Sequence, residues 1–483
     1  MSQWEPHDRR RAALAAVEAR LAAEGPSADL LLARADLLAG LGHVESAKAA
    51  YLTLLRRQPD HRLGLNHFGA LVHGLGFASA ARTLYAQAAL SHPADPMSQV
   101  NLANSLVAAG DMAAARAAFE AALAAAPDDA PAHRGLARLA ADRGDHALAA
   151  QHLNAAFAGR PVIEQLYRGD GPPITLLLLI SGLAADIPLS HALDPAVFKV
   201  IALAPAFFDP AQPLPAHDLA FNTIGDADLA PEALRAAERL IDRLDRPLIN
   251  PPERVAVTGR VENARRLAGL PGVVTAASVL LPRDEAAALD RAAVQALGLD
   301  LPLAVRAPGY HTGLHFERID QIDQLAAAVA SLPGERVILM RFIDTQGADG
   351  LYRKYRAMIV DGALYPLHLA VSAQWKAHYF TADMAGSPAR RAEDLAYLQD
   401  MGAVIGPVAM AGLEAVRQAL GLDYGGIDFA LGPDGALVVF EANATMVVYP
   451  PPADPIWDYR RAPTQRILEA LKTMLIRRAR AGA

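Results

Sequence analysis

The sequence predicts a multidomain protein in which an α-helical repeat array precedes domains of mixed α and β structure. Three observations support this prediction: a 34-residue period in the first third of the chain, apolar runs that alternate with helical stretches after residue 173, and hairpin signals in the last third. A chain of 483 residues exceeds what one hydrophobic core usually serves, so two or three domains are expected.

Composition and charge exclude several classes of protein. Apolar residues make up 53% of the chain and charged residues 20%, which excludes a largely disordered protein. With a net charge of −7, the chain lacks the excess of basic residues that is typical of a nucleic-acid-binding protein. The absence of cysteine excludes a disulfide framework, a zinc-thiolate site and a thiol nucleophile. The polar first residues and the short longest apolar run, Ile174–Ile180, lead us to expect a cytoplasmic protein with no nucleic-acid or membrane partner.

Four kinds of residue recur every 34 positions in the first third of the sequence. The columns are Pro59, Pro93, Pro127 and Pro161; Ala47, Ala81, Ala115 and Ala149; Gly42, Gly76, Gly110 and Gly144; and Tyr51, Tyr85, Phe119 and Leu153. The alanine would let two antiparallel helices approach closely, and the bulky residue would fill the gap toward the next unit. The glycine would form the turn between paired helices, and the proline would end each unit.

This pattern resembles the tetratricopeptide repeat, with four units over about residues 28–161 and a capping helix over Arg9–Ala23. The resemblance implies a helical array over residues 1–163 whose concave surface commonly holds a peptide or protein. The alternative interpretation of the array is a module for dimerisation or for packing against the neighbouring domain.

After a linker over Gly169–Pro173, apolar strands alternate with helical stretches, which is typical of a small parallel sheet. We expect strands over Ile174–Ser181, Phe198–Ala204 and Asp218–Thr223, followed by a helix over Pro231–Leu244. Polar residues at the strand ends, namely Ser181, Asn222 and Asp226, are interpreted as turn formers rather than ligands.

From about residue 250 the pattern changes to a helix, then strands and hairpins. Two strands flank a turn that contains Gly309 and Gly313, and a hydrophobic strand follows in ERVILMRFID. An Asp-Gly turn at Asp361-Gly362 indicates a hairpin, and a last hairpin turns at Pro433-Asp434-Gly435.

The last hairpin carries candidate metal ligands. Asp428 and Glu441 flank its turn at matching distances, so pairing of the two strands would bring the carboxylates close together. Asn443 lies two residues beyond Glu441 and would point to the same face. Oxygen ligands of this kind suit Mg²⁺, which bridges such groups to nucleotide phosphates. A bound cation would also relieve the repulsion between the two carboxylates.

With the sequence IDFALGPDGALVVFEAN, residues 251–475 resemble an ATP-grasp domain, and residues 174–250 resemble the α/β domain that usually precedes it. The resemblance implies that Asp428, Glu441 and Asn443 hold two Mg²⁺ ions, or Mn²⁺ in their place, against ATP. It further implies a lid over the phosphates at Gly309, His311, Thr312 and Gly313, and an adenine-binding hinge at Met340, Arg341, Phe342 and Ile343. Arg356 would lie near the transferred phosphoryl group, with Lys354 beside it.

Two positions depart from the family pattern, because the usual phosphate-binding lysines read as Arg260 and Arg306. An arginine fork binds phosphate oxygens with two hydrogen bonds, and Arg306 is also a candidate for catalysis. The acidic residue that would hold the ribose is Asp344 or Asp349. Lys354 shares one strand face with Arg356, whereas Arg353 lies on the other.

The resemblance implies an ATP-dependent ligase that joins a carboxylate to an amine through an acylphosphate, releasing ADP and phosphate. The repeats suggest that one substrate is a peptide or protein. A polar and aromatic stretch is a candidate acceptor pocket, or else a partly buried loop: His368, Ser372, Trp375, Lys376, His378 and Tyr379. The competing function is a protein-interaction scaffold with a nucleotide-sensing or degenerate ATP-grasp domain. A homodimer is compatible with either.

Overall fold

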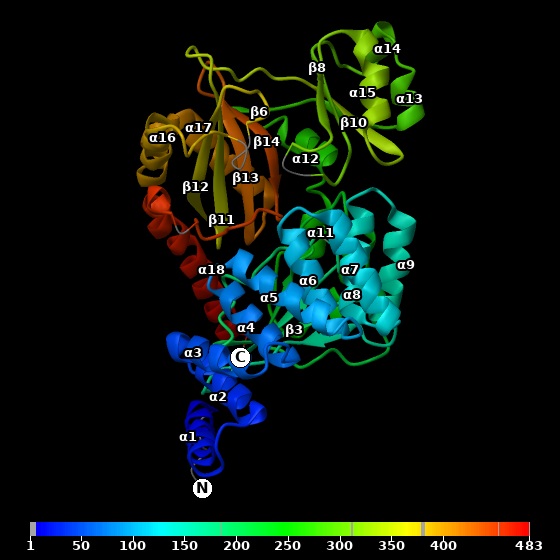
Figure 1. Cartoon of the computed structure of the whole chain (residues 1–483). Helices are drawn as coiled ribbons and strands as arrows, with labels where there is room; N and C mark the ends of the chain where they lie inside the picture. The colour runs from blue at the N-terminus through cyan, green and yellow to red at the C-terminus, as the bar shows by residue number, and fades with distance from the viewer. Residues whose placement is uncertain (1–5, 184, 311–312, 378–381, 453, 483) are drawn as a thin grey trace. The chain divides into compact units, whose positions relative to one another are not determined.

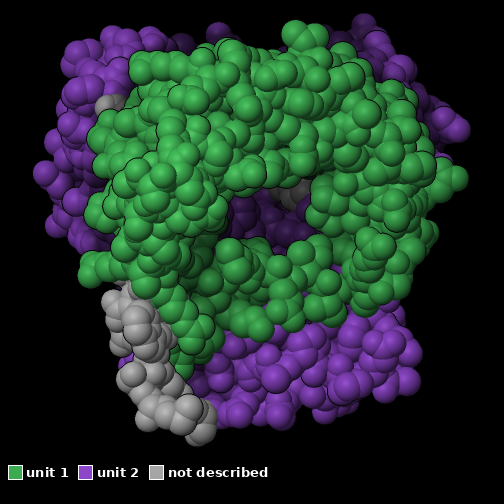
Figure 2. All heavy atoms as spheres, turned by 60° about the horizontal axis from the view of Figure 1, so that its bottom comes forward, with its two compact units in different colours: residues 1–173, 195–200 green, residues 174–194, 201–483 purple. Residues whose placement is uncertain are grey.

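The computed structural model describes residues 6–183, 185–310, 313–377, 382–452 and 454–482. The chain divides into two compact units (Figures 1 and 2). Unit 1 comprises residues 1–173 and 195–200, and unit 2 comprises residues 174–194 and 201–483. The predicted linker Gly169–Pro173 falls at the end of the first stretch of unit 1.

The described part of unit 1 consists mainly of helices that pack in successive antiparallel pairs. The helices are α1 (Pro6–Glu24), α2 (Ala28–Gly40), α3 (Val44–Arg57), α4 (Arg62–Gly74), α5 (Ala78–Ser91), α6 (Pro96–Ala108), α7 (Met112–Ala125), α8 (Ala130–Ala141) and α9 (His146–Phe157). A short strand, β1 (Val162–Glu164), follows them. The predicted helix pairs are confirmed, and the expected capping helix is α1, which begins three residues earlier than predicted.

Each repeated residue does what its chemistry predicts. The four column glycines sit between paired helices at φ angles of 76° to 86°, where a side chain would be strained. The column alanines are at most 3% exposed, at the closest approach of the paired helices. Two aromatic residues of the bulky column pack over a glycine of an adjacent helix, Tyr85 over Gly69 and Phe119 over Gly135, and an added Cβ at Gly135 would lie 2.2 Å from the ring of Phe119.

Gly135→Ala should therefore destabilise unit 1 by about 1–3 kcal/mol, because the rigid Phe119 ring has no room to move away. Gly74, at the end of α4, is the matched control, since an added Cβ there meets no atom within 4 Å. Gly74→Ala should leave stability unchanged or raise it by less than about 1 kcal/mol. Denaturant unfolding of the two full-length variants checks this, and equal midpoints would contradict the packing argument.

Unit 2 begins with a small sheet in which β2 (Ile174–Leu179), β4 (Leu219–Asn222) and β5 (Leu248–Ile249) are parallel neighbours, as predicted. Strand β3 (Phe198–Leu203) also forms where expected. The polar strand-end residues are turn formers: Ser181 Oγ accepts from the N–H of Leu183, and Asp226 Oδ1 accepts from the N–H groups of Asp228 and Leu229.

The predicted helix Pro231–Leu244 is shorter than expected. α10 (Pro231–Glu238) ends six residues before Leu244, and a separate 3₁₀ turn, η2 (Ile241–Arg243), follows it. The cap N–H of Arg239 bonds to the carbonyls of Ala237 and Arg235, which tightens the last turn and ends the helix. Another 3₁₀ turn, η1 (Pro205–Phe207), packs against α10.

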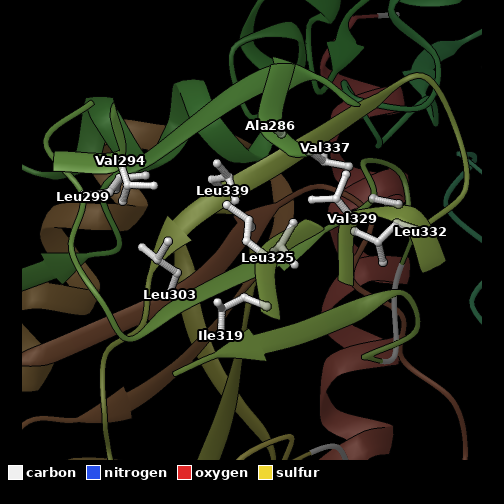
Figure 3. Packing of buried hydrophobic residues seen from close by; sticks show 12 residues of the cluster. Ala286, Val294, Leu299, Leu303, Ile319, Leu325, Val329, Leu332, Val337 and Leu339 are labelled. Atoms are coloured by element: carbon white, nitrogen blue, oxygen red, sulfur yellow. The ribbon is translucent and has the colours of Figure 1, made fainter. Parts of the chain in front are cut away.

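A four-stranded sheet with three helices forms the smaller lobe of the predicted ATP-grasp region (Figure 3). Its strand order is β7-β10-β8-β9, and every pair is antiparallel. The elements are β7 (Ser278–Pro282), α13 (Arg283–Ala287), α14 (Arg291–Ala296), β8 (Leu303–Arg306), β9 (Phe316–Ile319), η3 (Ile322–Gln324), α15 (Leu325–Ser331) and β10 (Arg336–Arg341). Aliphatic side chains such as Leu303, Val329 and Leu339 fill the core between strands and helices, as Figure 3 shows.

A five-stranded sheet with order β12-β11-β13-β14-β6 forms the larger lobe. The β11–β12 hairpin turns at Asp361-Gly362, where both residues have positive φ as the sequence predicted. The elements are α11 (Pro252–Ala256), α12 (Arg260–Leu267), β6 (Val273–Thr275), β11 (Tyr352–Val360), β12 (Ala363–Ser372), α16 (Pro388–Gln399), α17 (Met401–Leu420), β13 (Tyr424–Leu431), β14 (Leu437–Asn443), η4 (Pro455–Arg460) and α18 (Arg461–Ala481).

Helices α16 and α17 pack on this sheet (Figure 1). Within the described residues, one helix, α17, is long and apolar enough to cross a membrane by length and composition alone. It contacts β6, β13 and β14 through its buried residues, and it is kinked at Gly406, whose φ is 78°. The helix α18 contacts β4, β11 and β12, and its Arg477 and Arg478 form ion pairs with Asp361.

Candidate functional site

An open cleft in unit 2 has an empty volume of about 520 Å³, part of it open to solvent. Four parts of the chain line it: the loop after β4, helix α12 with β6, the turn after β8, and the end of β14. The lining residues are Gly225, Asp226, Ala227, Asp228, Thr258, Arg260, Asn263, Ala264, Leu267, Thr275, Gly309, Tyr310, Val439, Phe440, Glu441, Ala442 and Asn443. Two of the three predicted metal ligands, Glu441 and Asn443, therefore lie on the cleft wall.

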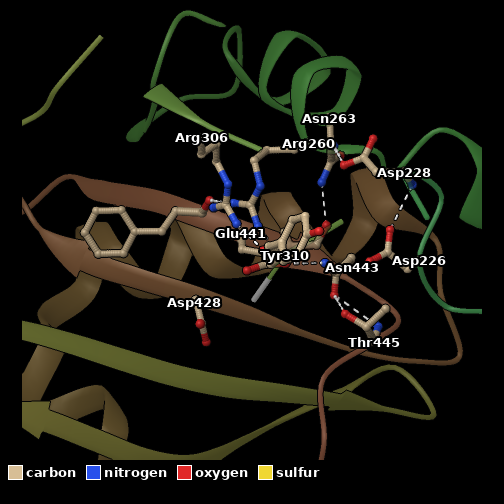
Figure 4. Close-up of polar contacts among 12 residues, drawn as sticks. Asp226, Asp228, Arg260, Asn263, Arg306, Tyr310, Asp428, Glu441, Asn443 and Thr445 are labelled. Carbon is tan, nitrogen blue, oxygen red and sulfur yellow. Dashed lines mark hydrogen bonds and ion pairs between the residues drawn. The ribbon is translucent and has the colours of Figure 1, made fainter. Parts of the chain in front are cut away.

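Glu441 is the centre of a polar cluster on this wall (Figure 4). Its Oε1 lies 2.9 Å from Nη2 of Arg260 and accepts a 2.8 Å hydrogen bond from Nδ2 of Asn443. Asn443 Oδ1 in turn accepts from the hydroxyl and the N–H of Thr445. The prediction that Glu441 and Asn443 share a face is confirmed, because their side chains are in direct contact.

Asp428 lies directly opposite Glu441 in the register of β13 and β14, as the turn geometry predicted. Its carboxylate is fully buried and pairs with β11, where Arg356 donates two hydrogen bonds of 2.6 and 2.9 Å. Lys354 Nζ lies 2.6 Å from the same carboxylate. Burial raises the pKa of Asp428, but Arg356 and Lys354 outweigh it, so the pKa lies well below its ordinary value. Asp428 stays ionised.

The donor set fits a hard divalent cation. Two carboxylates and one amide oxygen come from adjacent strands, and oxygen ligands of this kind are those that Mg²⁺ prefers. Glu441 is also close enough to Asp428 to raise its pKa by repulsion. In this structure Arg260, Arg356 and Lys354 balance the two carboxylates in the way that a bound cation would.

Arg306, at the end of β8, is buried beside this cluster. Its guanidinium donates to the carbonyl of Tyr310 and lies over the ring of Phe316, 5.2 Å from the centroid. Its Nε has no hydrogen-bond partner among the described residues. Burial lowers the pKa of Arg306 to about 9, and the nearby charge of Arg260 adds to the effect. Two arginines thus gather next to Glu441, which favours an anionic ligand.

The other predicted nucleotide-binding residues belong to the turn after β8 and to the end of β10 with the residues that follow it. Gly309 lines the cleft, and Gly309 and Gly313 both have positive φ, whereas His311 and Thr312 lie outside the described residues. Met340 and Arg341 end β10, and Phe342 and Ile343 follow them. The N–H of Phe342 donates to the carbonyl of Pro302.

The two candidates for the ribose-binding acid have different partners. Asp349 forms an ion pair with Arg353, which holds its pKa down at about 2. Asp344 Oδ1 accepts a hydrogen bond from the N–H of Gln346. Arg353 also pairs with Glu393. The expectation that Arg353 and Arg356 lie on opposite faces is thereby confirmed.

The predicted acceptor stretch has both buried and exposed members. His368 and Ser372 are buried on β12, and burial holds the pKa of His368 well below its ordinary value. Trp375 packs edge-on against Phe316 and Phe342, and Lys376 pairs with Glu317 at 3.3 Å. His378 and Tyr379 lie outside the described residues. None of the described members lines the cleft.

Sequence reasoning missed Asp228, Asn263 and Tyr310 as cleft residues. Asp228 Oδ2 accepts from the N–H of Arg260, the first residue of α12. Asn263 is three residues further along α12, on the same helix face as Arg260. That spacing and the position of Asp228 beyond the carboxyl end of a parallel strand were the available signals.

Comparison with known proteins identifies the repeats. Models of the tetratricopeptide repeat match residues 28–61, 74–130 and 100–161. These residues form tetratricopeptide repeats, which suggest a protein-interaction scaffold. No curated protein matches the chain.

Among solved structures, a MamA fragment from Desulfovibrio magneticus RS-1 has 19% sequence identity and a TM-score of 0.28, covering 31% of this chain and 84% of that chain. Another MamA crystal structure has 15% identity and the same TM-score, covering 33% and 94%.

Proposed function

We propose that this protein is an ATP-dependent carboxylate–amine ligase. We further propose that the tetratricopeptide repeats in the first third of the chain bind a protein. The observation that supports the ligase is the pairing of Asp428 with Glu441 across β13 and β14, surrounded by Arg260, Arg306, Lys354 and Arg356. Carboxylates within a cationic cluster are what a magnesium-bound polyphosphate requires.

In the proposed reaction, the substrate carboxylate attacks the γ-phosphorus of ATP and ADP leaves. The amine then attacks the acylphosphate carbonyl, phosphate leaves, and the amine nitrogen gives up its proton. Mg²⁺ held by Asp428, Glu441 and Asn443 would neutralise charge on the phosphates. Arg260 and Arg306 would orient phosphate oxygens through their forked N–H groups. Lys354 and Arg356 would keep Asp428 ionised and add positive charge beside the transferred group.

The alternative is a scaffold in which the repeats bind a protein and the second unit senses a nucleotide or has lost activity. The repeats themselves favour it, and so do the arginines at positions 260 and 306. The two proposals differ in turnover. A ligase forms ADP over many turnovers only when both a carboxylate and an amine are present, whereas a scaffold binds its partner with no such turnover.

Glu441→Gln provides the test. For the unaltered protein, Mg²⁺ with ADP at about a hundred times its Kd should add roughly 2.7 kcal/mol of stability, which is measured as a raised Tm. Glu441→Gln should abolish most of this gain, because the neutral amide is a weaker metal ligand and no longer pairs with Arg260. The control is Glu335→Gln, an exposed glutamate of the smaller lobe. A gain that survives Glu441→Gln, or no gain with any purine nucleotide, would refute the proposed site.

A further inference from the structure

The cleft has an acidic side that the proposed nucleotide site does not use. Asp226 and Asp228 lie in the loop after β4 and line the same cleft as Arg260 and Gly309. Together with Glu441, which the proposed metal site also uses, the lining residues include three carboxylates, and the guanidinium groups of Arg260 and of Arg306, buried beside the wall, offset two of these charges. The cleft wall therefore has an excess of negative charge.

Arg260 already has several partners on this wall. Its guanidinium contacts Glu441 and the carbonyl of Phe440, and its backbone N–H donates to Oδ2 of Asp228. Oδ1 of Asp228 makes no hydrogen bond to any residue that the structure describes. Burial raises the pKa of Asp228, and the charges of Asp226 and Glu441 raise it further.

A second acceptor is left open on the same wall. Asn263 is 4% exposed and lines the cleft, and its Nδ2 donates to the carbonyl of Ala442 (Figure 4). Its Oδ1 is buried and has no hydrogen-bond partner among the described residues. A buried acceptor left without a donor is unfavourable, so a ligand that supplies an N–H there would be favoured.

We propose that this side of the cleft binds the ammonium group of a substrate, with Asp228 supplying the charge and Asn263 Oδ1 a further acceptor. The assignment rests on the proposed function in one respect: it makes this ammonium the acceptor amine of the ligase. An ammonium has three N–H donors and no acceptor, which matches a wall of acceptors with excess negative charge. A hydroxyl group supplies one donor and no charge, and a carboxylate would be repelled.

The experiment compares pairs of small molecules in which only the ammonium is replaced by a hydroxyl. The probes are a panel of amino-acid amides and the matching α-hydroxy amides, such as alaninamide and lactamide, titrated into the full chain by calorimetry without nucleotide. For the tightest pair, the ammonium member should bind at least about tenfold more tightly than its hydroxyl counterpart. Asp228→Asn should remove this preference and leave the affinity for the hydroxyl member unchanged.

Two further variants complete the test. Asp284→Asn, at an exposed aspartate of α13 outside the cleft, should keep the full preference. Asn263→Leu, in which the new side chain has a similar volume, should weaken binding of the ammonium member alone. This variant replaces Asp228→Asn in the test if Asp228→Asn does not fold. Equal affinities within every pair, or no binding by any ammonium member, would overturn the proposal. Since nucleotide is absent, such a result is distinct from failure of the nucleotide test.

Discussion

Asp428→Ala should destabilise unit 2 by about 3–5 kcal/mol and abolish binding of Mg²⁺ with nucleotide. The fully buried carboxylate of Asp428 is the ion-pair partner of both Arg356 and Lys354. Removing it leaves two cations in a buried site with no counter-charge, and such a loss is among the largest that one substitution causes. The metal site would lose one of its two carboxylates at the same time.

Denaturant unfolding measures the first effect, and the Tm gain with Mg²⁺ and ADP measures the second. Asp323→Ala, at an exposed aspartate of the smaller lobe, is the control and should change neither. Adding Lys354→Met to Asp428→Ala should recover part of the lost stability, because one stranded charge is removed. A single variant as stable as the unaltered protein would show that Asp428 does not hold these cations.

Asp394→Ala should cost a similar amount, about 3–5 kcal/mol, but leave nucleotide binding intact. Asp394 lies on α16 with its side chain 0% exposed, and it accepts hydrogen bonds from Nε of Arg460, the hydroxyl of Tyr459 and the N–H of Leu369. Burial raises the pKa of Asp394, which the charge of Arg460 partly offsets. The pair ties α16, β12 and η4 together, and neither of its residues lines the cleft.

The double variant Asp394→Leu with Arg460→Met tests the cause. Replacing both charges by apolar side chains of similar size should recover much of the stability that either single change loses, because neither charge is then stranded. Loss of Mg²⁺–ADP binding in a folded Asp394→Ala protein would contradict the view that this pair is purely structural. A double variant no more stable than the singles would contradict the assignment of the loss to the unpaired charge.

Local patterns predicted most of the fold. The 34-residue period predicted the helix pairs, since each repeated residue acts within its own unit or the next. The position of the turn fixed the register that sets Asp428 opposite Glu441, because a hairpin leaves little freedom in strand pairing. Alternation along β11 likewise separated Arg353 from Lys354 and Arg356.

The composition of the site could not be predicted in the same way, because it depends on contacts between distant parts of the chain. Arg356 meets Asp428 across 72 residues, and Asn263 meets the carbonyl of Ala442 across 179. No local pattern encodes which strand pairs with β13 or which helix covers the end of β14. For the same reason the sequence could not show that the loop after β4 lines the cleft, and the acceptor pocket at His368 and beyond stays a prediction.

Unit 1 is built from two stretches of chain, and this has a consequence for the order of folding. The helical repeats make local contacts and would form as they leave the ribosome. Residues 195–200 belong to the same unit but follow β2, the first strand of unit 2. Unit 1 is therefore complete only after unit 2 has begun, and a fragment that stops at Pro173 lacks part of it. The two proposed functions are better separated with point substitutions than by cutting the chain.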